Sequence, residues 1–313
     1  MGHLATGPVV SVDRLHKTYG STVAVDDVTF TVERGEIFGL LGSNGAGKTT
    51  TVECLEGLRR PDGGSVRLLG VDPLARAGQL RGRVGCQLQE SRLPDRMRVW
   101  EALDLFAAAA PHGADWRPLL DDWGLAEKRL APFASLSGGQ RQRLLVALAL
   151  VTDPEVVFLD EMTTGLDPAA RHASWELIEA IRERGTTLVL VTHFMDEAER
   201  LCDRIAVMDR GRIVAQGTPR RLIEEHAGEA RVRFSADGHD ADAAVPDFGW
   251  LTGVRHVRSV KQERDAVEVT GDGAVLIHVA AALLDRGFEP SDLHVDRPTL
   301  EETFLKLTGH GLE

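Results

Sequence analysis

Residues 42–49 read GSNGAGKT, and this stretch decides the fold class of the chain. It matches the pattern G-x-x-x-x-G-K-[ST], follows the apolar run EIFGLLG at 36–42 and precedes the helical pattern TTVECLEGL. Glycines let a backbone wrap tightly enough for successive N–H groups to point at phosphate oxygens, and the start of a helix favours the same anion. Lys48 adds a positive charge for the β- and γ-phosphates, and the Thr49 hydroxyl can bind Mg²⁺. The stretch therefore predicts a P-loop that binds a nucleotide.

Two further apolar runs predict parallel strands of one sheet: EVVFLD at 155–160 and TTLVLVT at 186–192. Because parallel strands deliver ligand-binding groups at their carboxyl ends, the residues that follow these runs should meet near the P-loop. After the first run come Asp160 and Glu161, of which one carboxylate can hold Mg²⁺ while the other polarises a water aimed at a γ-phosphate. After the second comes His193. A histidine there is often only a hydrogen-bonded turn residue, but delivery to the same sheet edge favours a role in the site.

The rest of the first 226 residues fits the same α/β plan. Between Gly82 and Val151, VWEALDLFAAAA and RQRLLVALALV have helical periodicity, which predicts a helical insert in the sheet domain. Before Gly35 the sequence alternates with period two around turn residues, which predicts a small antiparallel sheet.

The sequence changes character after about residue 227. Short alternating stretches, a helix from Ala274 to about Asp285 and a final helix predict a small α+β domain. Thr299 and Glu302 have the spacing of a capping box at the start of that last helix. We therefore expect two domains, 1–227 and 228–313. The second could stabilise a dimer, regulate the first, or merely pack against it.

Composition restricts the class of protein. The chain has 313 residues and a formal net charge of −12, which argues against nucleic acid or anionic lipid held by bulk electrostatics. Its three cysteines (Cys54, Cys86 and Cys202) lie far apart without a CxxC pair, so we expect small buried side chains in a reducing compartment. The N-terminus lacks a secretory pattern, and no apolar run approaches the about 20 residues that span a bilayer. We expect a cytoplasmic protein that reaches a membrane through a partner.

Taken in order, the motifs resemble a known family. Tyr19, GSNGAGKT, Gln89, LSGGQ at 136–140, VVFLDE, GLD and His193 are similar to the nucleotide-binding subunit of an ATP-binding-cassette (ABC) transporter over residues 8–220. The flanks VTHFMDEAERLCDRIAVMDRGRIVAQGTP and PTLEETFLKLTG resemble its drug-resistance and antibiotic-export branch, the daunorubicin-resistance (ABC-2 exporter) type. The resemblance implies a P-loop NTPase fold with a mixed sheet core, an antiparallel β subdomain and a helical subdomain. It also implies ATP and Mg²⁺ as cofactors and ATP hydrolysis coupled to transport.

The resemblance also implies roles for residues of this chain. Asp160 would hold the metal, Glu161 would be the catalytic base and His193 would contact the γ-phosphate. Tyr19 would stack on adenine, although a structural tyrosine is an equal alternative. The catalytic residues would be Lys48, Gln89, Glu161 and His193. The metal ligands would be Thr49, Gln89 and Asp160. The residues around the phosphates would be Gly42, Ser43, Asn44, Gly45, Ala46, Gly47, Lys48, Thr49 and Thr50.

Two details of the motifs are specific to this chain. Gln89 would lie near Mg²⁺ and the attacking water, and its spacing in VGCQLQE favours it over Gln87. Met162 stands where the family usually has proline, so the turn leading to Asp167 lacks the fixed φ that proline enforces. We expect activity to survive this change.

The segment LSGGQRQR at 136–143 contains no acid, histidine or cysteine, so it offers no base or nucleophile. Its serine hydroxyl, glycine amides and following helix N-terminus suit a terminal phosphate. Since the chain has its own P-loop, this second phosphate-binding element implies a nucleotide shared with another copy. In the family resemblance, Asp167 crosses the same interface. The residues that would contact the partner's nucleotide are Ser137, Gly138, Gly139 and Gln140.

The leading hypothesis is therefore an ATPase homodimer that drives a separate integral-membrane permease and exports a drug, antibiotic or lipid-like compound. The segment ESRLPDRMRVW at 90–100 is a candidate surface for that partner. The apolar residues in it that could contact a permease or instead form a local core are Leu93, Pro94, Met97, Val99 and Trp100. A soluble ABC ATPase of DNA repair, chromosome organisation or translation is one alternative. A small-molecule kinase is another, but it would leave LSGGQ unexplained.

Overall fold

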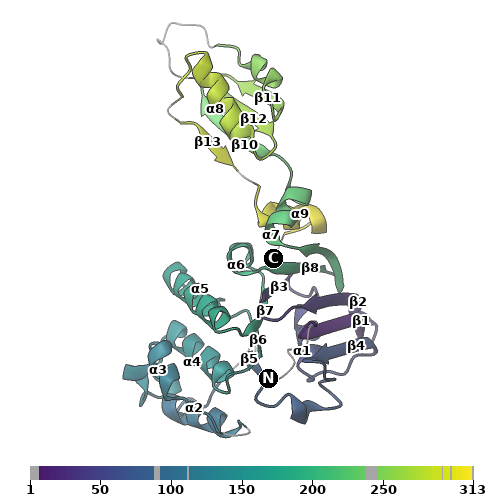
Figure 1. Cartoon of the computed structure of the whole chain (residues 1–313), viewed down its shortest axis with the longest axis vertical. Helices are drawn as coiled ribbons and strands as arrows, with labels where there is room; N and C mark the ends of the chain where they lie inside the picture. Colours follow the sequence, from purple (N-terminus) through teal and green to yellow (C-terminus); the bar gives the residue numbers. More distant parts are fainter. Residues whose placement is uncertain are drawn as a thin grey trace. The chain divides into compact units, whose positions relative to one another are not determined.

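The computed structural model describes residues 7–87, 92–110, 113–236, 246–290, 292–296 and 298–311. The chain divides into two compact units (Figure 1): one comprises Met1–Arg220 and Leu307–Glu313, and the other Arg221–Lys306. The predicted boundary at residue 228 lies close to this division, and the assignment of two domains stays a prediction. Each unit is described separately below.

A six-stranded sheet forms the centre of the first unit, in the order β5-β6-β7-β3-β8-β9. All neighbouring pairs are parallel except β8 with β9, which confirms a mixed sheet. Every residue of β3, β6 and β7 is buried, as the continuous apolar runs predict. The strands are β3 (Ile37–Leu41), β5 (Val84–Gln87), β6 (Val156–Asp160), β7 (Thr187–Thr192), β8 (Arg204–Asp209) and β9 (Arg212–Gly217).

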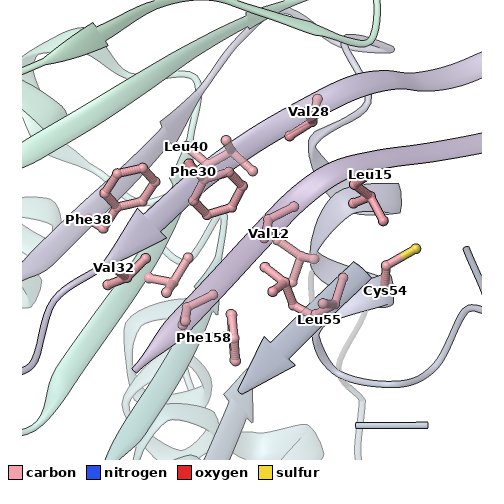
Figure 2. Packing of buried hydrophobic residues seen from close by; sticks show 14 of the residues in the cluster. Val12, Leu15, Val28, Phe30, Val32, Phe38, Leu40, Cys54, Leu55 and Phe158 are labelled. Atoms are coloured by element: carbon pink, nitrogen blue, oxygen red, sulfur yellow. The ribbon is translucent and has the colours of Figure 1, made fainter. Parts of the chain in front are cut away.

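An antiparallel sheet of β1 (Val10–Tyr19), β2 (Thr22–Val32) and β4 (Gly63–Leu68) packs against the central sheet in the order β2-β1-β4. Figure 2 shows the shared core, in which the Phe30 and Phe38 rings from the two sheets stack with centroids 5.1 Å apart. The buried face of α1 (Lys48–Leu55) joins the same core. The antiparallel subdomain predicted before Gly35 is confirmed, and β4 adds a third strand from further along the chain.

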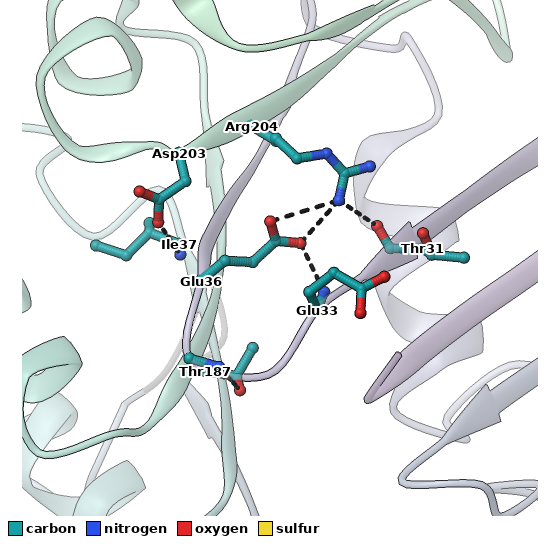
Figure 3. Close-up of polar contacts among 8 residues, drawn as sticks. Thr31, Glu33, Glu36, Ile37, Thr187, Asp203 and Arg204 are labelled. Atoms are coloured by element: carbon teal, nitrogen blue, oxygen red, sulfur yellow. Dashed lines mark hydrogen bonds and ion pairs between the residues drawn. The ribbon is translucent and has the colours of Figure 1, made fainter. Parts of the chain in front are cut away.

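Polar contacts fix the start of β3, the strand that leads into the P-loop (Figure 3). Arg204 Nη1 donates to Glu36 Oε1 at 3.0 Å and to the Thr31 carbonyl at 3.3 Å. The Ile37 N–H donates to Asp203 Oδ2 at 2.9 Å, which ties β3 to the chain just before β8. Because the amino end of β3 is held in this way, its carboxyl end has a defined position for the loop that follows.

The helices of the first unit include the predicted helical insert. Val99–Ala108 and Gly138–Leu150 are both helical, so the insert is confirmed, although the second helix begins before the predicted RQRLLVALALV run. After α1, the α-helices described in this unit are α2 (Val99–Ala108), α3 (Arg117–Asp122), α4 (Gly138–Leu150), α5 (Pro168–Glu183), α6 (Met195–Leu201) and α7 (Pro219–Leu222). The last of them, α7, begins in this unit and ends two residues after Arg220. Short 3-10 turns cover Ala77–Gln79, Ala126–Lys128 and Phe133–Ser135.

The second unit is α+β. Its antiparallel sheet has the order β11-β12-β10-β13, and α8 (Val275–Asp285) covers a core that contains Phe234 and Phe248. The helix predicted from Ala274 is thus confirmed. At the start of α9 (Leu300–Thr308), the Glu302 N–H donates to Thr299 Oγ1 at 3.2 Å, as the cap predicts. The remaining elements are a π-helical turn (Ile223–Ala227), a 3-10 turn (Gly249–Gly253), β10 (Ala230–Ser235), β11 (Val257–Glu263), β12 (Ala266–Gly271) and β13 (His294–Asp296).

Candidate active site

The loop between β3 and α1 curls around the Lys48 ammonium. Lys48 Nζ donates to the Gly42 carbonyl at 2.7 Å and to the Ser43 carbonyl at 3.0 Å, and the side chain is buried. Burial lowers the pKa of Lys48, while the negative charges of Glu161 and Asp160 oppose that shift. A buried ammonium group at the start of a helix suits anionic phosphate oxygens. The predicted P-loop is therefore formed within a single chain.

This loop depends on one glycine and on a turn that the sequence analysis missed. Gly47 has φ +100°, and a Cβ atom there would lie 2.3 Å from the Ala24 carbonyl oxygen, so only glycine fits. The Gly211 N–H donates to the Ala46 carbonyl at 2.9 Å, and the Gly211 carbonyl accepts from the Asp26 N–H at 2.7 Å. The turn between β8 and β9 thus connects the P-loop to β2. No spacing in the sequence indicates this contact, because Gly211 is distant along the chain.

Two carboxylates, Asp160 and Glu161, lie at the carboxyl end of β6, close enough to Lys48 for their charges to affect its pKa. Asp160 is 4% exposed, and its Oδ1 atom has no hydrogen-bond partner among the described residues. Burial raises the pKa of Asp160 to about 6, with a further contribution from the charge of Glu161, while the Lys48 charge lowers it. A buried carboxylate oxygen without a donor, facing a lysine and a phosphate loop, suits a cation.

Glu161 and His193 meet at the carboxyl ends of β6 and β7. His193 Nδ1 lies 3.2 Å from Glu161 Oε1, with the donor set by the tautomer. Glu161 has φ +48°, an uncommon left-handed conformation for a residue with a side chain, and its N–H donates to the Val191 carbonyl at 2.9 Å. The two strands therefore deliver both side chains to one point, as predicted from their position in the sequence.

Ser137 is the N-cap of α4 and forms a reciprocal capping box with Gln140. The Gln140 N–H donates to Ser137 Oγ at 3.3 Å, and Gln140 Oε1 accepts from the Ser137 N–H at 3.0 Å. Ser137 and Gly138 are exposed, and a Cβ atom at Gly138 would have open space around it. Gln140 thus has an unpredicted structural role, since it fixes the shape of the segment that presents Ser137.

The other predicted contacts lie at more exposed positions. Tyr19 ends β1 and is 41% exposed, with Lys17 Nζ at 5.6 Å and Arg59 Cζ at 5.7 Å from its ring centroid. Asp167 is the exposed N-cap of α5, and its Oδ1 accepts from the Ala170 N–H at 2.9 Å. Thr49 is exposed in the first turn of α1.

Several predictions need correction or fall outside the structure's description. Gln89 lies outside the described residues, whereas Gln87 is buried at the end of β5. Met162 is also buried, so methionine at this position packs in the core. Cys54 and Cys202 are buried as predicted, but the prediction is wrong for Cys86, which is exposed on the edge strand β5.

Comparisons with known proteins agree with this geometry. A family model described as ABC transporter matches residues 25–164. Nod factor export ATP-binding protein I of Paraburkholderia xenovorans is 46% identical over 312 residues, which cover 97% of this chain and 98% of that protein. This chain belongs to the ABC transporter ATP-binding proteins. A second member, the daunorubicin resistance ATP-binding protein of Streptomyces coeruleorubidus, is 38% identical and covers 96% of both chains.

Solved ABC transporter structures share the fold. An ATP-binding subunit of an ABC transporter matches with a TM-score of 0.64 and 30% identity over 69% of this chain and 92% of that one. CbiO1 from Clostridium perfringens matches with a TM-score of 0.63 and 28% identity over 70% of this chain and 91% of that one. As an ABC transporter ATP-binding subunit of the ABC-2 exporter type, the chain binds and hydrolyses ATP in a reaction coupled to transport. Subunits of this family work with membrane permeases.

Two features of the described residues bear on what this ABC subunit can bind or cross. No described helix is long and apolar enough to cross a membrane. Within the same ranges, no group of three or more His, Cys, Asp or Glu side chains is arranged to hold a metal ion. A metal at Asp160 would therefore need further ligands, which hydroxyl, water and phosphate oxygens can provide.

Proposed function

We propose that two copies of this chain bind two ATP molecules head to tail, hydrolyse them at the shared interface and drive export through a separate permease. The observation that carries this proposal is the open, capped segment at Ser137–Gly138. Each chain has a formed P-loop, and it also presents a second set of phosphate-type donors on its surface. A second nucleotide, bound by the P-loop of a partner copy, would account for the second set.

The glycine at position 138 supports this proposal. It has no positive φ, and a side chain there would meet nothing within 4 Å. The fold of the single chain therefore does not require glycine at this position, and a close approach by something outside the chain would. The Ser137 hydroxyl accepts the cap bond from Gln140, so its own hydrogen remains available to a phosphate oxygen. The N-terminus of α4, a helix of 13 residues, favours that anion.

The chemistry at each site follows from the residues already placed. Lys48 binds the β- and γ-phosphates, Glu161 accepts a proton from the attacking water, and His193 contacts the γ-phosphate and orients Glu161. Tyr19 stacks on adenine, and Asp167 reaches across the interface. Asp160 and Thr49, with Gln89, would hold Mg²⁺, which neutralises charge on the phosphate oxygens when bound.

Glu161→Gln tests this assignment. The amide cannot accept the proton, so we expect hydrolysis to fall by about 10²-fold or more while ATP binding persists. The trapped ATP should hold the variant as a dimer, which light scattering with size-exclusion chromatography would detect. ATP hydrolysis at the wild-type rate would refute Glu161 as the base. Loss of hydrolysis with a monomer in saturating ATP would refute the shared interface.

The transported compound and the permease are proposed from the relatives. Their names describe export of Nod factor and resistance to daunorubicin, which favours a drug, antibiotic or lipid-like cargo. We expect the chain at the cytoplasmic face of the membrane, bound to the permease. Purification of Glu161→Gln from native membranes in ATP would identify that partner, and recovery of nucleic acid in its place would contradict the transport role.

The 90–100 segment is the proposed contact with the permease, with one correction. Val99 is fully buried at the start of α2, so it belongs to the core and is not available to a partner. Pro94 is exposed, and Trp100 is partly buried. We expect Trp100→Ala to weaken association with the permease and to spare the ATPase activity of the isolated subunit. Unchanged association would exclude this surface.

A further inference from the structure

A buried carboxylate lies behind the active site, on the helix that follows His193. Glu197 in α6 is 0% exposed. Its Oε1 atom accepts a hydrogen bond of 3.2 Å from the indole N–H of Trp175, a buried residue of α5. Burial of an ionisable group is costly unless neighbouring polar groups compensate, and such a residue needs a structural or functional reason.

Two threonines from the loops of the active site face the same carboxylate. Burial raises the pKa of Glu197, and the hydroxyls of Thr192 and Thr163, with the Trp175 indole, oppose that shift. Thr192 ends β7 and directly precedes His193. Thr163 is two positions after Glu161, on the way to Asp167. One side chain thus lies between the segments that carry the proposed base, its histidine partner and the residue that crosses the interface.

A second contact holds the same pair of helices together. Arg171 of α5 lies with Cζ 4.0 Å from the Phe194 ring centroid and with Nη1 3.6 Å from Asp196 Oδ2. Phe194 also donates its N–H to Thr192 Oγ1 at 3.0 Å. The segment after His193 is therefore fixed to α5 at two places. A movement of the Thr163 loop would then occur relative to a segment that stays in place.

The contact between Thr163 and Glu197 is incomplete. Among the described residues, Thr163 Oγ1 and Glu197 Oε2 are buried atoms without a hydrogen-bond partner in good geometry. Both residues are 0% exposed, so neither atom faces bulk solvent. Leaving a buried donor and a buried acceptor unpaired is unfavourable, and a small displacement that joined them would remove both penalties at once.

We infer that Glu197 is a positioning residue for ATP hydrolysis: its carboxylate accepts the Thr163 hydroxyl when the Asp167 loop docks on a second copy, and this bond sets Glu161 against His193. The inference rests on the roles of Glu161, His193 and Asp167 in the proposed function. It adds a mechanism by which docking at the interface reaches the hydrolytic side chains. Glu197 does so without touching the nucleotide.

Thr163→Val tests the bond directly, because valine keeps the shape of threonine and lacks the hydroxyl. We expect kcat to fall about tenfold with KM for ATP within about twofold of wild type, as for an interaction made only in the transition state. Thr163→Ser restores a hydroxyl and should recover most of kcat. Ser174→Ala is the matched control, since its buried hydroxyl donates to the Ala170 carbonyl of the same helix, at 2.9 Å.

Glu197→Met gives an independent test, because methionine is similar in length and lacks both the carboxylate and the amide with which glutamine could still bond to the Thr163 hydroxyl. It should lower kcat on its own and should add little to Thr163→Val, because both changes remove the bond between residues 163 and 197. An unchanged kcat in Thr163→Val, an equal loss in Thr163→Ser, or additive losses in the double variant would each overturn the inference. If Glu197→Met does not fold, the Val and Ser variants decide alone.

The proposed function can fail separately. If Glu161→Gln hydrolyses ATP at the wild-type rate, the catalytic assignment fails whatever the Thr163 variants do. If Glu161→Gln is inactive and forms the ATP-bound dimer, while Thr163→Val has wild-type kcat, only the role of Glu197 fails.

Discussion

His193 Nδ1 lies 3.2 Å from Glu161 Oε1, so the side chains at the ends of β6 and β7 already form a contact within one chain. Glu161 takes a left-handed backbone conformation at this point, and His193 is one of the neighbours that contact its carboxylate. This contact favours His193 as an orienting group for the proposed base, in addition to its proposed contact with phosphate.

His193→Ala should therefore lower kcat more than it weakens ATP binding. Removing a preorganised polar group that acts on the reacting centre typically costs about 10²–10³-fold in rate. We expect a loss of that order in steady-state hydrolysis, with the Kd for ATP changed by less than about tenfold. A variant that binds ATP far more weakly and hydrolyses bound ATP normally would show that His193 only holds the nucleotide.

Asp160→Asn should stabilise the ligand-free protein at neutral pH while abolishing metal-dependent hydrolysis. The pKa of Asp160 in the fold is raised to about 6 from its ordinary value of 3.8, so its stabilising contribution is complete below pH 3.8 and is lost as the pH rises through 6. At pH 7.5 the asparagine avoids a cost of about 1 to 3 kcal/mol, from roughly two pKa units at 1.36 kcal/mol each, less the lost attraction to Lys48.

Thermal unfolding across pH measures this effect. The Tm of Asp160→Asn should exceed that of wild type by several degrees at pH 7.5, and the gap should close near pH 4. Excess Mg²⁺ with ATP should raise the Tm of wild type by more than it raises the Tm of Asp160→Asn. A gap that stays constant with pH would mean that Asp160 ionises normally.

Glu56→Gln offers a second test of buried charge outside the proposed catalytic set. Burial raises the pKa of Glu56 to about 7 from 4.5, and the Cys86 thiol, a weak donor, offsets only part of this shift. The ionised form is destabilising above pH 7, so glutamine should stabilise the fold by about 1 to 3 kcal/mol at pH 8 and by almost nothing below pH 4.5. Chemical denaturation at the two pH values decides this. Equal stability of both proteins at pH 8 would contradict the shift.

The parts of the site that follow directly from strands could be predicted from the sequence. An apolar run with a polar residue at its end fixes both the strand and the place of that residue, so Asp160, Glu161 and His193 could be assigned to one edge. The P-loop was equally predictable, since its glycines and Lys48 act within a few positions of each other.

Contacts between distant segments could not be predicted in this way. Gly211 is hydrogen-bonded to Ala46 of the P-loop, and Glu197 of α6 lies near Thr163 in the segment after β6. Both contacts depend on how the turn after β8 and the helix α6 pack in the fold. Local hydrophobic periodicity in the sequence does not indicate this packing. Val99 illustrates the same limit, because the sequence does not distinguish an apolar residue on a docking surface from one buried in a core.

Gly138→Ala separates a role in the fold from a role at the interface. The backbone at Gly138 lies outside the left-handed region, and a new methyl group would meet nothing, so the single chain should tolerate it. Replacing glycine in a helix with alanine adds up to about 1 kcal/mol of stability where the conformation fits. We therefore expect an unchanged or slightly higher Tm together with a large loss of hydrolysis. In the Glu161→Gln background, the substitution should also prevent the ATP-dependent dimer.

Gly47→Ala is the contrasting variant, because its methyl group would lie 2.3 Å from the Ala24 carbonyl and should disrupt the P-loop itself. If Gly138→Ala keeps wild-type hydrolysis and dimerisation, the exposed cap of α4 does not bind the partner's nucleotide, and the second phosphate site must lie elsewhere.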